Sequence, residues 1–226
     1  MNYIFVTGTD TGVGKTVISL ILMDYFLKKN KKPIYLKLIQ TGCDDVFHKD
    51  SDAYFVYKNL LLDVDRRFLA DKVCYLFKNP KAPYFAARDE NKEIDIEYLQ
   101  NWVIERSKGY DKIVLEGAGG LMVPIWKNFF IIDFIKLIKA KVILVARPSL
   151  GTINHTLLSI EALKNKNIPV MAIILSMKQQ EDKTLIEQNI EAIYNYSKIK
   201  VFLIEKIEDP LRDLEKYFDV MEQIQG

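Results

Sequence analysis

The sequence predicts an α/β fold in which helices cover both faces of one mostly parallel, doubly wound sheet. Three observations predict it. Short apolar runs alternate along the chain with longer stretches of helical periodicity. Several of the apolar runs are unbroken, as in strands that are buried on both faces. Glycines follow the ends of several runs, where a doubly wound sheet binds its ligands.

The chain has no internal repeat, low-complexity tract or Gly/Ser linker, and its 226 residues suit one domain spanning residues 1–226. Its hydrophobic fraction of 49% and charged fraction of 27% are ordinary for a soluble globular protein. The formal net charge is +2 and the basic residues are scattered, so we expect no nucleic-acid partner. The longest apolar runs fall short of the roughly 20 residues that a membrane span needs, so we expect no membrane partner either.

The chain contains two cysteines, Cys43 and Cys74, and their spacing is not that of a metal site. So few cysteines indicate a reducing compartment and argue against a disulfide framework. No signal sequence is visible, because the N-terminus enters the first expected strand within a few residues. We therefore expect a cytoplasmic protein.

Taken in order, the apolar runs predict strands at Tyr3–Thr7, Ile34–Ile39, Lys112–Glu116, Val142–Ala146, Val170–Leu175 and Lys200–Ile204. Helical spacing of apolar residues predicts helices at Lys15–Lys29, Ser51–Leu62, Ile94–Lys108, Asn154–Lys164 and Thr184–Tyr196. Ser51 or Asp50 would cap the second helix. The alternation is interrupted between Thr41 and Glu93, where a crossover of about fifty residues should hold a helix or two and binding loops.

The first strand runs into a glycine-rich turn and then a helix, through the residues Gly8-Thr9-Asp10-Thr11-Gly12-Val13-Gly14-Lys15-Thr16. Backbone N–H groups and the helix N-terminus converge in such a turn and bind a phosphate chain. Lys15 would reach the terminal phosphates, and the Thr16 hydroxyl would ligate Mg²⁺. The spacing departs from the usual G-x-x-x-x-G-K-[ST], because Gly8 lies one residue early and Thr9 stands in the first glycine position. The stretch predicts a nucleotide-phosphate site and a fold of the P-loop NTPase type.

Carboxylates at two places are candidate ligands of the same Mg²⁺ ion. The third strand ends in Glu116, and the glycine-rich stretch from Gly117 to Gly120 indicates close backbone approach to a ligand. An acidic residue there, far downstream of the phosphate loop, matches a ligand of nucleotide-bound Mg²⁺ better than an ordinary strand-end residue. Asp52 is either a second such ligand or a helix-cap or surface residue, and the sequence favours neither.

Lys37 lies inside the apolar second strand, where a charged residue rarely stands without a partner. At the ligand-binding end of the sheet, its ammonium would face phosphate or a developing anion. The alternative is a solvent-facing lysine on an edge strand. Thr41, next to Gly42, would add a hydroxyl at the same end of the sheet. His48 and His155 lack a Ser or Cys partner, so we expect them to be structural or surface residues.

Together these segments resemble dethiobiotin synthetase, a family of ATP-dependent enzymes of biotin biosynthesis. The resemblance covers most of the first 155 residues, in the family's order, through Phe5 to Thr16, Lys37 with Thr41-Gly42, Ser51-Asp52-Ala53, Pro80-Lys81-Ala82-Pro83, Glu116 to Gly120, and Leu150-Gly151-Thr152-Ile153-Asn154-His155. The combination of these motifs is much more specific than a phosphate loop alone.

The resemblance implies a homodimer of P-loop α/β subunits, with Mg²⁺ as cofactor and ATP as cosubstrate. The implied reaction joins CO₂ to 7,8-diaminononanoate and closes the cyclic urea of dethiobiotin, with release of ADP and phosphate. An amine first forms a carbamate, whose oxygen attacks the γ-phosphate, and the second amine then closes the ring on the carbamic-phosphoric anhydride. The protein's part is to position these groups and to stabilise spreading negative charge.

The resemblance also implies roles for residues at matching positions. Lys37, Lys15 and Thr11 would be catalytic, the two lysines by neutralising phosphate and carbamate charge. Nucleotide binding would fall to Gly12, Val13, Gly14, Lys15, Thr16, Val17 and Asp52, and Mg²⁺ binding to Thr16, Asp52 and Glu116. Substrate binding would fall to Thr41, Pro83, Tyr84, Ile153 and Asn154. The last two would act from the partner subunit across a two-fold interface.

The chain departs from the family's pattern where the base would bind. Many members have an Asn after the strand that matches Val170–Leu175, whereas this chain continues with Ser176 and Met177. The later stretch from Phe202 to Lys206 also lacks the Pro-containing pattern that often contacts the base. We therefore expect weak discrimination between ATP and other nucleoside triphosphates.

Two other classes of protein are alternatives. Dimeric nucleotide switches of the partition or septum-site type share the fold and a similar phosphate loop. They carry an additional lysine where this chain has Asp10, and they often have a membrane or DNA surface, which this chain lacks. An ATP-dependent amidoligase such as a cobyrinate-type synthase usually needs a glutaminase domain, for which 226 residues leave no room. The nucleotide switch is thus the main alternative to the ligase.

Overall fold

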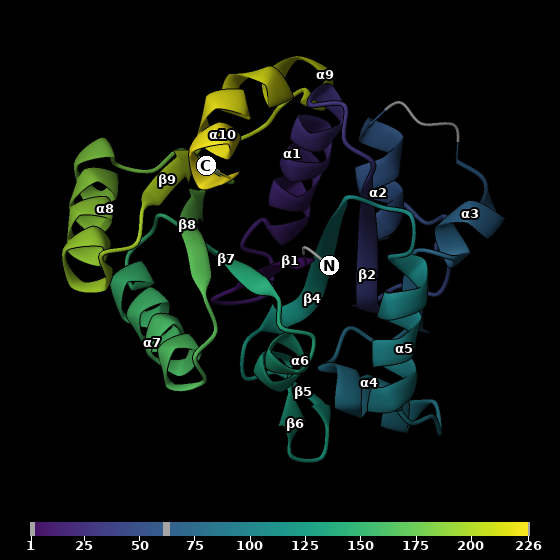
Figure 1. The fold of residues 1–226 in the computed structure, drawn as a ribbon. Helices are drawn as coiled ribbons and strands as arrows, with labels where there is room; N and C mark the ends of the chain where they lie inside the picture. Colours follow the sequence, from purple (N-terminus) through teal and green to yellow (C-terminus); the bar gives the residue numbers. More distant parts are fainter. Residues whose placement is uncertain (1–2, 61–63, 226) are drawn as a thin grey trace.

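The computed structural model describes residues 3–60 and 64–225 of the chain. Its main sheet has seven parallel strands in the order β3-β2-β4-β1-β7-β8-β9 (Figure 1). These strands are β1 (Tyr3–Gly8), β2 (Pro33–Thr41), β3 (Val73–Phe77), β4 (Lys112–Gly120), β7 (Lys141–Ala146), β8 (Val170–Ser176) and β9 (Val201–Ile204). A separate antiparallel hairpin consists of β5 (Pro124–Trp126) and β6 (Phe129–Phe130).

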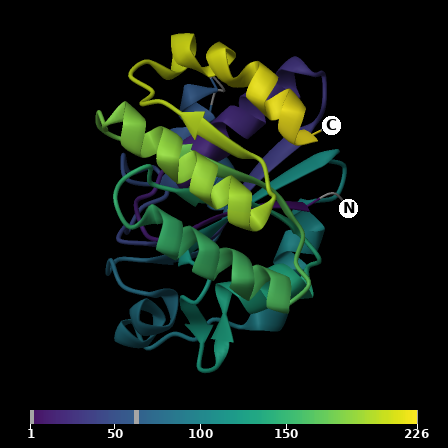
Figure 2. The ribbon, with the colours of Figure 1, turned by 90° about the vertical axis from the view of Figure 1, so that its left-hand side faces the viewer.

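Helices cover both faces of the main sheet, which confirms the expected doubly wound α/β fold (Figure 1). One face carries α1 (Lys15–Lys28), α2 (Asp52–Asn59), α3 (Arg66–Ala70), the short 3-10 helix η1 (Leu214–Tyr217) and α10 (Phe218–Gln225). The other face carries α4 (Pro83–Asp89), α5 (Ile96–Arg106), α6 (Ile131–Leu137), α7 (Thr152–Asn165) and α8 (Lys183–Ser197). Figure 2 shows α7 and α8 side by side. The short helix α9 (Pro210–Asp213) precedes η1.

Each central strand contributes to two hydrophobic cores, because successive side chains of a strand point to opposite faces of the sheet. In β1, Phe5 belongs to the core beneath α4 to α8, whereas Ile4 and Val6 belong to the core beneath α1 and α10. All three side chains are fully buried. Burial on both sides explains why these strands are unbroken apolar runs in the sequence.

The expected strands are all present. Strand β9 begins at Val201, one residue later than expected, and β4 continues beyond Glu116 to Gly120. Strand β4 therefore extends beyond Glu116 through its glycine-rich end, which approaches the phosphate loop. Gly120 pairs with Gly8 at the end of β1.

The expected helices are also present, with small differences at their ends. Helix α7 begins at Thr152, two residues before the expected start. Ser51 is the N-cap of α2, because its hydroxyl accepts a hydrogen bond from the backbone N–H of Tyr54. The helix ends at Asn59, and its expected end at Leu62 lies outside the described residues.

The crossover between Thr41 and Glu93 contains α2, α3 and α4, and also a strand that the sequence does not predict. Strand β3 pairs in parallel with β2 and forms one edge of the sheet. Strand β2 is therefore an interior strand, so the alternative of Lys37 as a solvent-facing edge lysine is wrong.

The hairpin β5–β6 and helix α10 are likewise not predicted from the sequence. Met221 and Ile224 of α10 are buried in the core beside α1.

Cys43 and Cys74 are both free thiols. Within residues 3–60 and 64–225, no helix has the length and apolar character required to cross a membrane.

Candidate active site

The phosphate loop connects β1 to α1 in the middle of the sheet. Gly12 and Gly14 have φ angles of 70° and 102°, in the left-handed region that favours glycine. Gly14 is the N-cap of α1, and the first N–H groups of a helix have no partner within the helix. The loop therefore presents backbone donors and the positive end of the helix dipole to one point, as an anion site requires.

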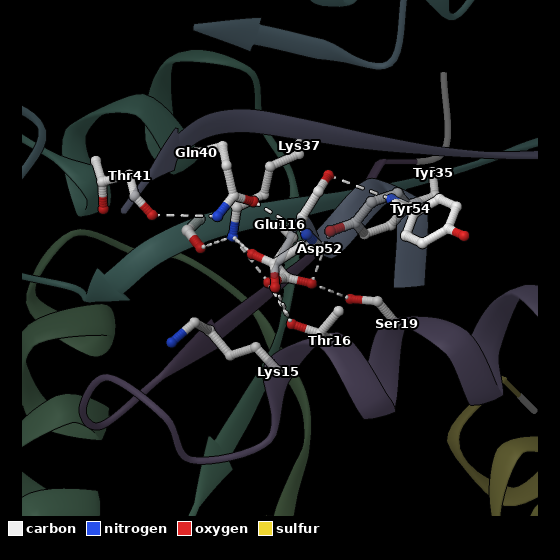
Figure 3. A network of polar contacts seen from close by, with 12 residues as sticks. Lys15, Thr16, Ser19, Tyr35, Lys37, Gln40, Thr41, Asp52, Tyr54 and Glu116 are labelled. Carbon is white, nitrogen blue, oxygen red and sulfur yellow. Dashed lines mark hydrogen bonds and ion pairs between the residues drawn. The ribbon is translucent and has the colours of Figure 1, made fainter. Parts of the chain in front are cut away.

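Lys15, the first residue of α1, folds back along the loop. Its Nζ donates a hydrogen bond to the Asp10 carbonyl oxygen at 3.0 Å, and its side chain points toward the loop in Figure 3. Burial of the ammonium, with a smaller contribution from the charge of Lys37, lowers the pKa of Lys15 to about 8. A bound phosphate would favour the charged amine and offset this burial.

Lys37 is the centre of a buried ion-pair network (Figure 3). Its Nζ lies 2.6 Å from Asp52 Oδ2 and 2.9 Å from Glu116 Oε1, and it donates a further hydrogen bond to the Gly117 carbonyl oxygen. Burial alone would lower the pKa of Lys37, but the charges of the two carboxylates outweigh burial and raise it. The Thr16 hydroxyl contacts the same carboxylates, at 2.8 Å from Asp52 Oδ1 and 3.1 Å from Glu116 Oε1.

Glu116 is 1% exposed, and both of its oxygens are hydrogen-bonded. Its Oε2 accepts hydrogen bonds from Ser19 Oγ at 2.9 Å and from Tyr35 OH at 3.0 Å. Burial, reinforced by the nearby carboxylate charges, raises the pKa of Tyr35 well above its ordinary value, so the phenol remains a donor. The two donors fix the plane of the carboxylate and leave Oε1 directed at Lys37 and Thr16.

The order of the strands explains why residues far apart in sequence meet here. Strands β2, β4 and β1 are neighbours, and Lys37 stands directly opposite Glu116 in the ladder between β2 and β4. Glu116 in turn stands opposite Val6, shortly before the phosphate loop. Asp52 is the first residue of α2, and its backbone N–H donates to Gln40 Oε1 at 3.1 Å. Ser51, not Asp52, caps α2, so the Asp52 carboxylate is available to Lys37 and Thr16.

A cavity of about 600 Å³ opens beside this network, and it extends from the phosphate loop to the turn Pro80–Pro83. This volume is ordinary for a small-molecule site. The residues that the sequence predicts at the site and that line the cavity are Thr11, Gly12, Gly14, Lys15, Thr16, Val17, Lys37, Thr41, Asp52, Pro83 and Glu116.

Four other predicted site residues do not reach the cavity wall. Val13 is buried, and a side chain at Gly8 would touch it. Tyr84 packs edge to face on Trp126, with the ring centroids 5.7 Å apart. Ile153 and Asn154 lie at the start of α7 and do not line the cavity.

Several residues of the site are not predicted from the sequence. Gln40, Lys49 and Lys178 line the cavity, and Ser19 and Tyr35 hold Glu116. The signal that identifies Lys37, a polar residue within an apolar element, also applies to Ser19 and Gln40. Nothing in their local sequence indicates which carboxylate or backbone group they contact.

Arg147, which follows β7, holds the first half of the phosphate loop. Its Nη2 donates to Asp10 Oδ2 at 3.0 Å and to the Thr11 carbonyl oxygen at 3.1 Å. The Asp10 carboxylate also accepts a hydrogen bond from the Thr11 N–H at 2.6 Å. At the position where partition-type switches carry a lysine, this chain therefore has a carboxylate with its own structural partners.

The AAA domain family matches residues 2–209, which makes this chain a P-loop nucleotide-binding protein. Solved structures with the same fold align with nearly its whole length. A plasmid partition protein from Borrelia burgdorferi, bound to AMPPNP, aligns with a TM-score of 0.58 at 15% identity and covers 99% of this chain and 96% of its own. The MinC:MinD cell division complex of Aquifex aeolicus gives a TM-score of 0.57 at 16% identity, with 99% and 93% covered. Identities this low concern the fold alone.

Relatives with similar sequences identify the family more specifically than the fold does. The ATP-dependent dethiobiotin synthetase of Thermodesulfovibrio yellowstonii is 38% identical over 195 residues, which cover 81% of this chain and 79% of the relative. That of Methanocaldococcus jannaschii is 35% identical over 219 residues, covering 94% and 98%. The chain belongs to the dethiobiotin synthetase family, ATP-dependent ligases of biotin biosynthesis. This confirms the resemblance seen in the motifs, and the partition-type proteins share only the fold.

Proposed function

We propose that this chain catalyses the MgATP-dependent carboxylation and ring closure of 7,8-diaminononanoate with CO₂, giving dethiobiotin, ADP and phosphate, in the cavity beside the phosphate loop. The observation that carries this proposal is the position of Lys37. Its ammonium is buried between two carboxylates on the wall of the cavity that also includes the phosphate loop. A carbamate oxygen that attacks the γ-phosphate there would meet a fixed positive charge.

The phosphate chain of ATP would bind the loop through the N–H groups from Gly12 to Thr16. Lys15 would exchange its hydrogen bond to the Asp10 carbonyl for one to a phosphate oxygen, and would then hold its full charge. Thr11 is exposed on the cavity side of the loop, where its hydroxyl would reach the carbamate.

The donors around Thr16 fit a Mg²⁺ ion. The Thr16 hydroxyl lies 2.8 Å from an Asp52 oxygen and 3.1 Å from a Glu116 oxygen, and hard oxygens are the ligands that Mg²⁺ takes. Lys37 is the ammonium that forms ion pairs with these two carboxylates. The charge of Lys15 also acts on them, but Lys15 would turn to the bound phosphate, so the cluster would keep negative charge for a divalent cation. A bound ion would supply charge neutralisation at the β- and γ-phosphates.

The carbamate would form on an uncharged amine of the substrate, between Lys37 and the turn Pro80–Pro83. The ammonium of Lys37 would stabilise the charge that builds up as the carbamate oxygen attacks phosphorus. Thr41 would orient the diamine end by hydrogen bonds, and Pro83 would pack on the aliphatic chain. The second amine then attacks the carbonyl carbon of the anhydride, and phosphate leaves.

A homodimer would complete this site. Leu150 is 88% exposed just before α7, and Leu158 is 63% exposed one turn beyond Asn154 on the same face of that helix. Large apolar side chains with this exposure support a protein contact. Ile153 and Asn154 would then receive the far carboxylate of the substrate in the partner's cavity.

The nucleotide site should discriminate weakly between bases. Ser176, at the place where many relatives have Asn, is 3% exposed, and its hydroxyl occupies the space next to Gly14. It is therefore turned toward the phosphate loop and away from a base. Steady-state rates with ATP, GTP and CTP should be of similar size, and a strong preference for ATP alone would contradict this expectation.

Incubation with 7,8-diaminononanoate, labelled bicarbonate and MgATP tests the reaction. Label should enter a ureido product as ADP is released. The proposal would be overturned by a folded protein that binds ATP and yet puts no label into such a product.

A further inference from the structure

We propose that Lys178, in the loop after β8, binds the phosphate chain of the nucleotide and so supplies affinity that does not depend on the base. The inference rests on the proposed binding of nucleotide at the phosphate loop, and it adds a residue to that site from a different part of the chain. Lys178 lies two residues after Ser176, in the loop where the family resemblance places the contact with the base. In this chain, that loop would contact the phosphate chain instead.

The start of this loop is fixed against the phosphate loop. Ser176, the last residue of β8, is buried, and its hydroxyl fills the space that a side chain at Gly14 would occupy. The next residue, Met177, donates its backbone N–H to the Ile204 carbonyl oxygen at 2.8 Å. These two contacts fix the backbone of Ser176 and Met177 next to the phosphate loop, directly before Lys178.

The side chain of Lys178 extends over the mouth of the phosphate loop. Its Nζ lies 3.6 Å from the point where a Cβ at Gly12 would stand, and the residue lines the same cavity as Lys15 and Lys37. Because the lysine stem is long and flexible, its ammonium can follow a ligand bound over Gly12. A phosphate in the loop would lie within its reach.

The balance of charge at the cavity favours an anion next to Lys178. Lys37 is already matched by Asp52 and Glu116. Within residues 3–60 and 64–225, by contrast, the ammonium of Lys178 has no ion pair and no hydrogen bond. A triphosphate carries several negative charges, more than a bound Mg²⁺, Lys15 and the start of α1 would match together. Lys178 is thus a free cation at the point where that excess charge would lie.

Lys49 also lines the cavity, but in a different place. It lies next to the His48–Asp50 pair, before α2, whereas Lys178 lies above Gly12. Of these two lysines, Lys178 is the one whose ammonium approaches the phosphate loop at Gly12. A cation that contacts phosphate binds ATP, GTP and CTP equally well, because the phosphate chain is the same in all three.

Calorimetric titration of Lys178→Met with ATP, GTP and CTP in the presence of Mg²⁺ tests the inference. The dissociation constants should rise about 5- to 10-fold, by the same factor for each base, because one charge-assisted contact is lost. The rise should shrink at high salt, where an exposed charge pair is screened. Lys178 is exposed, so thermal unfolding of the variant should match that of the wild type.

Lys200→Met is the matched control. Lys200 is an exposed lysine at the amino end of β9, and the cavity lies at the carboxyl ends of the strands, so its loss should leave nucleotide binding unchanged. Wild-type affinity of Lys178→Met for all three nucleotides, or a loss confined to one base, would overturn the role of Lys178.

Lys15→Met distinguishes this failure from failure of the nucleotide site itself. If the wild type binds no nucleotide, or if Lys15→Met binds as tightly as the wild type, the phosphate site is wrong and the role of Lys178 falls with it. If Lys15→Met loses affinity while Lys178→Met does not, only the inference about Lys178 is wrong.

Discussion

Lys37 combines two roles that can be measured separately, because it neutralises buried carboxylates as well as facing the cavity. Lys37→Met should lower turnover by at least about 100-fold, through the loss of one charge at the developing anion. It should also lower the free energy of unfolding by about 3 kcal/mol, because Asp52 and Glu116 remain without their cation. Turnover assays and denaturant unfolding measure the two effects.

Mg²⁺ provides the control for this variant. Since the proposed metal ligands include the same two carboxylates, Mg²⁺ should restore part of the stability of Lys37→Met but none of its turnover. Equal stability of variant and wild type in the presence of a chelator would contradict the ion-pair network.

The two thiols should react slowly in the folded protein. Burial raises the pKa of Cys74 to about 12 and also raises the pKa of Cys43. Only the thiolate reacts, so alkylation of Cys74 by iodoacetamide at pH 8 should be at least about 100-fold slower than in the unfolded chain. Mass spectrometry after timed alkylation measures this, and rapid labelling of native Cys74 would be the contrary result.

The raised pKa of Cys74 also makes the stability of the fold depend on pH. Between pH 9 and about 12 the unfolded chain releases the Cys74 proton while the folded chain keeps it, so this thiol makes the fold less stable as pH rises through that window.

At the scale of single residues, the sequence predicts the charged members of the network but not the residues that orient them. Lys37 and Glu116 stand out because a charged residue in or at the end of an apolar strand needs a partner. Ser19 and Tyr35 donate to Glu116 from α1 and β2, and these meetings depend on the order of strands in the sheet. No local pattern contains that order.

At the scale of elements, the phosphate loop and the end of β8 form one packed unit through Gly14 and Ser176. Gly14→Ala should raise the dissociation constant for ATP at least about tenfold, because alanine is strained at a φ of 102° and its methyl group meets the Ser176 hydroxyl. Adding Ser176→Gly should remove the clash and leave the strain, so binding should recover only in part. Calorimetry measures both variants, and full recovery would show that the positive φ is not required.

Elements with a distinct pattern are predicted well, and those without one are not. The buried central strands are continuous apolar runs, and the cap at Ser51 has a chemical signature that the structure confirms. Strand β3 is short and only partly buried at the edge of the sheet, so its five residues resemble other apolar stretches within a long crossover. Its existence follows from pairing with β2, which is a long-range event.

At the scale of the whole molecule, the proposed dimer makes a direct prediction. Leu150→Asp should convert the protein to a monomer in light scattering and should lower turnover, because Ile153 and Asn154 would leave the partner's cavity. The fold should be preserved, since Leu150 is 88% exposed. Tyr196→Asp, at a residue that is 75% exposed near the end of α8, is the control and should change neither property.

A monomeric wild type would contradict the dimer, and a dimeric Leu150→Asp would contradict the position of the interface. The sequence motifs are sufficient for the family because several short segments must occur together and in order. They do not show which residues complete the site, because Ile153 and Asn154, which the motifs assign to substrate binding, do not line the cavity.

The pairing of Lys37 with Glu116 also bears on how the chain folds. The two residues are directly opposite in the ladder between β2 and β4, and about 70 residues separate these strands in the sequence. The whole intervening segment must close before the ion pair can form, so recovery of nucleotide binding during refolding should be a late event. If the register of this pairing slipped by one residue, the side chain of Lys37 would point into the apolar core on the opposite face of the sheet. The ion pair therefore penalises compact states with the wrong register, and the chemistry of the site helps to select the native sheet.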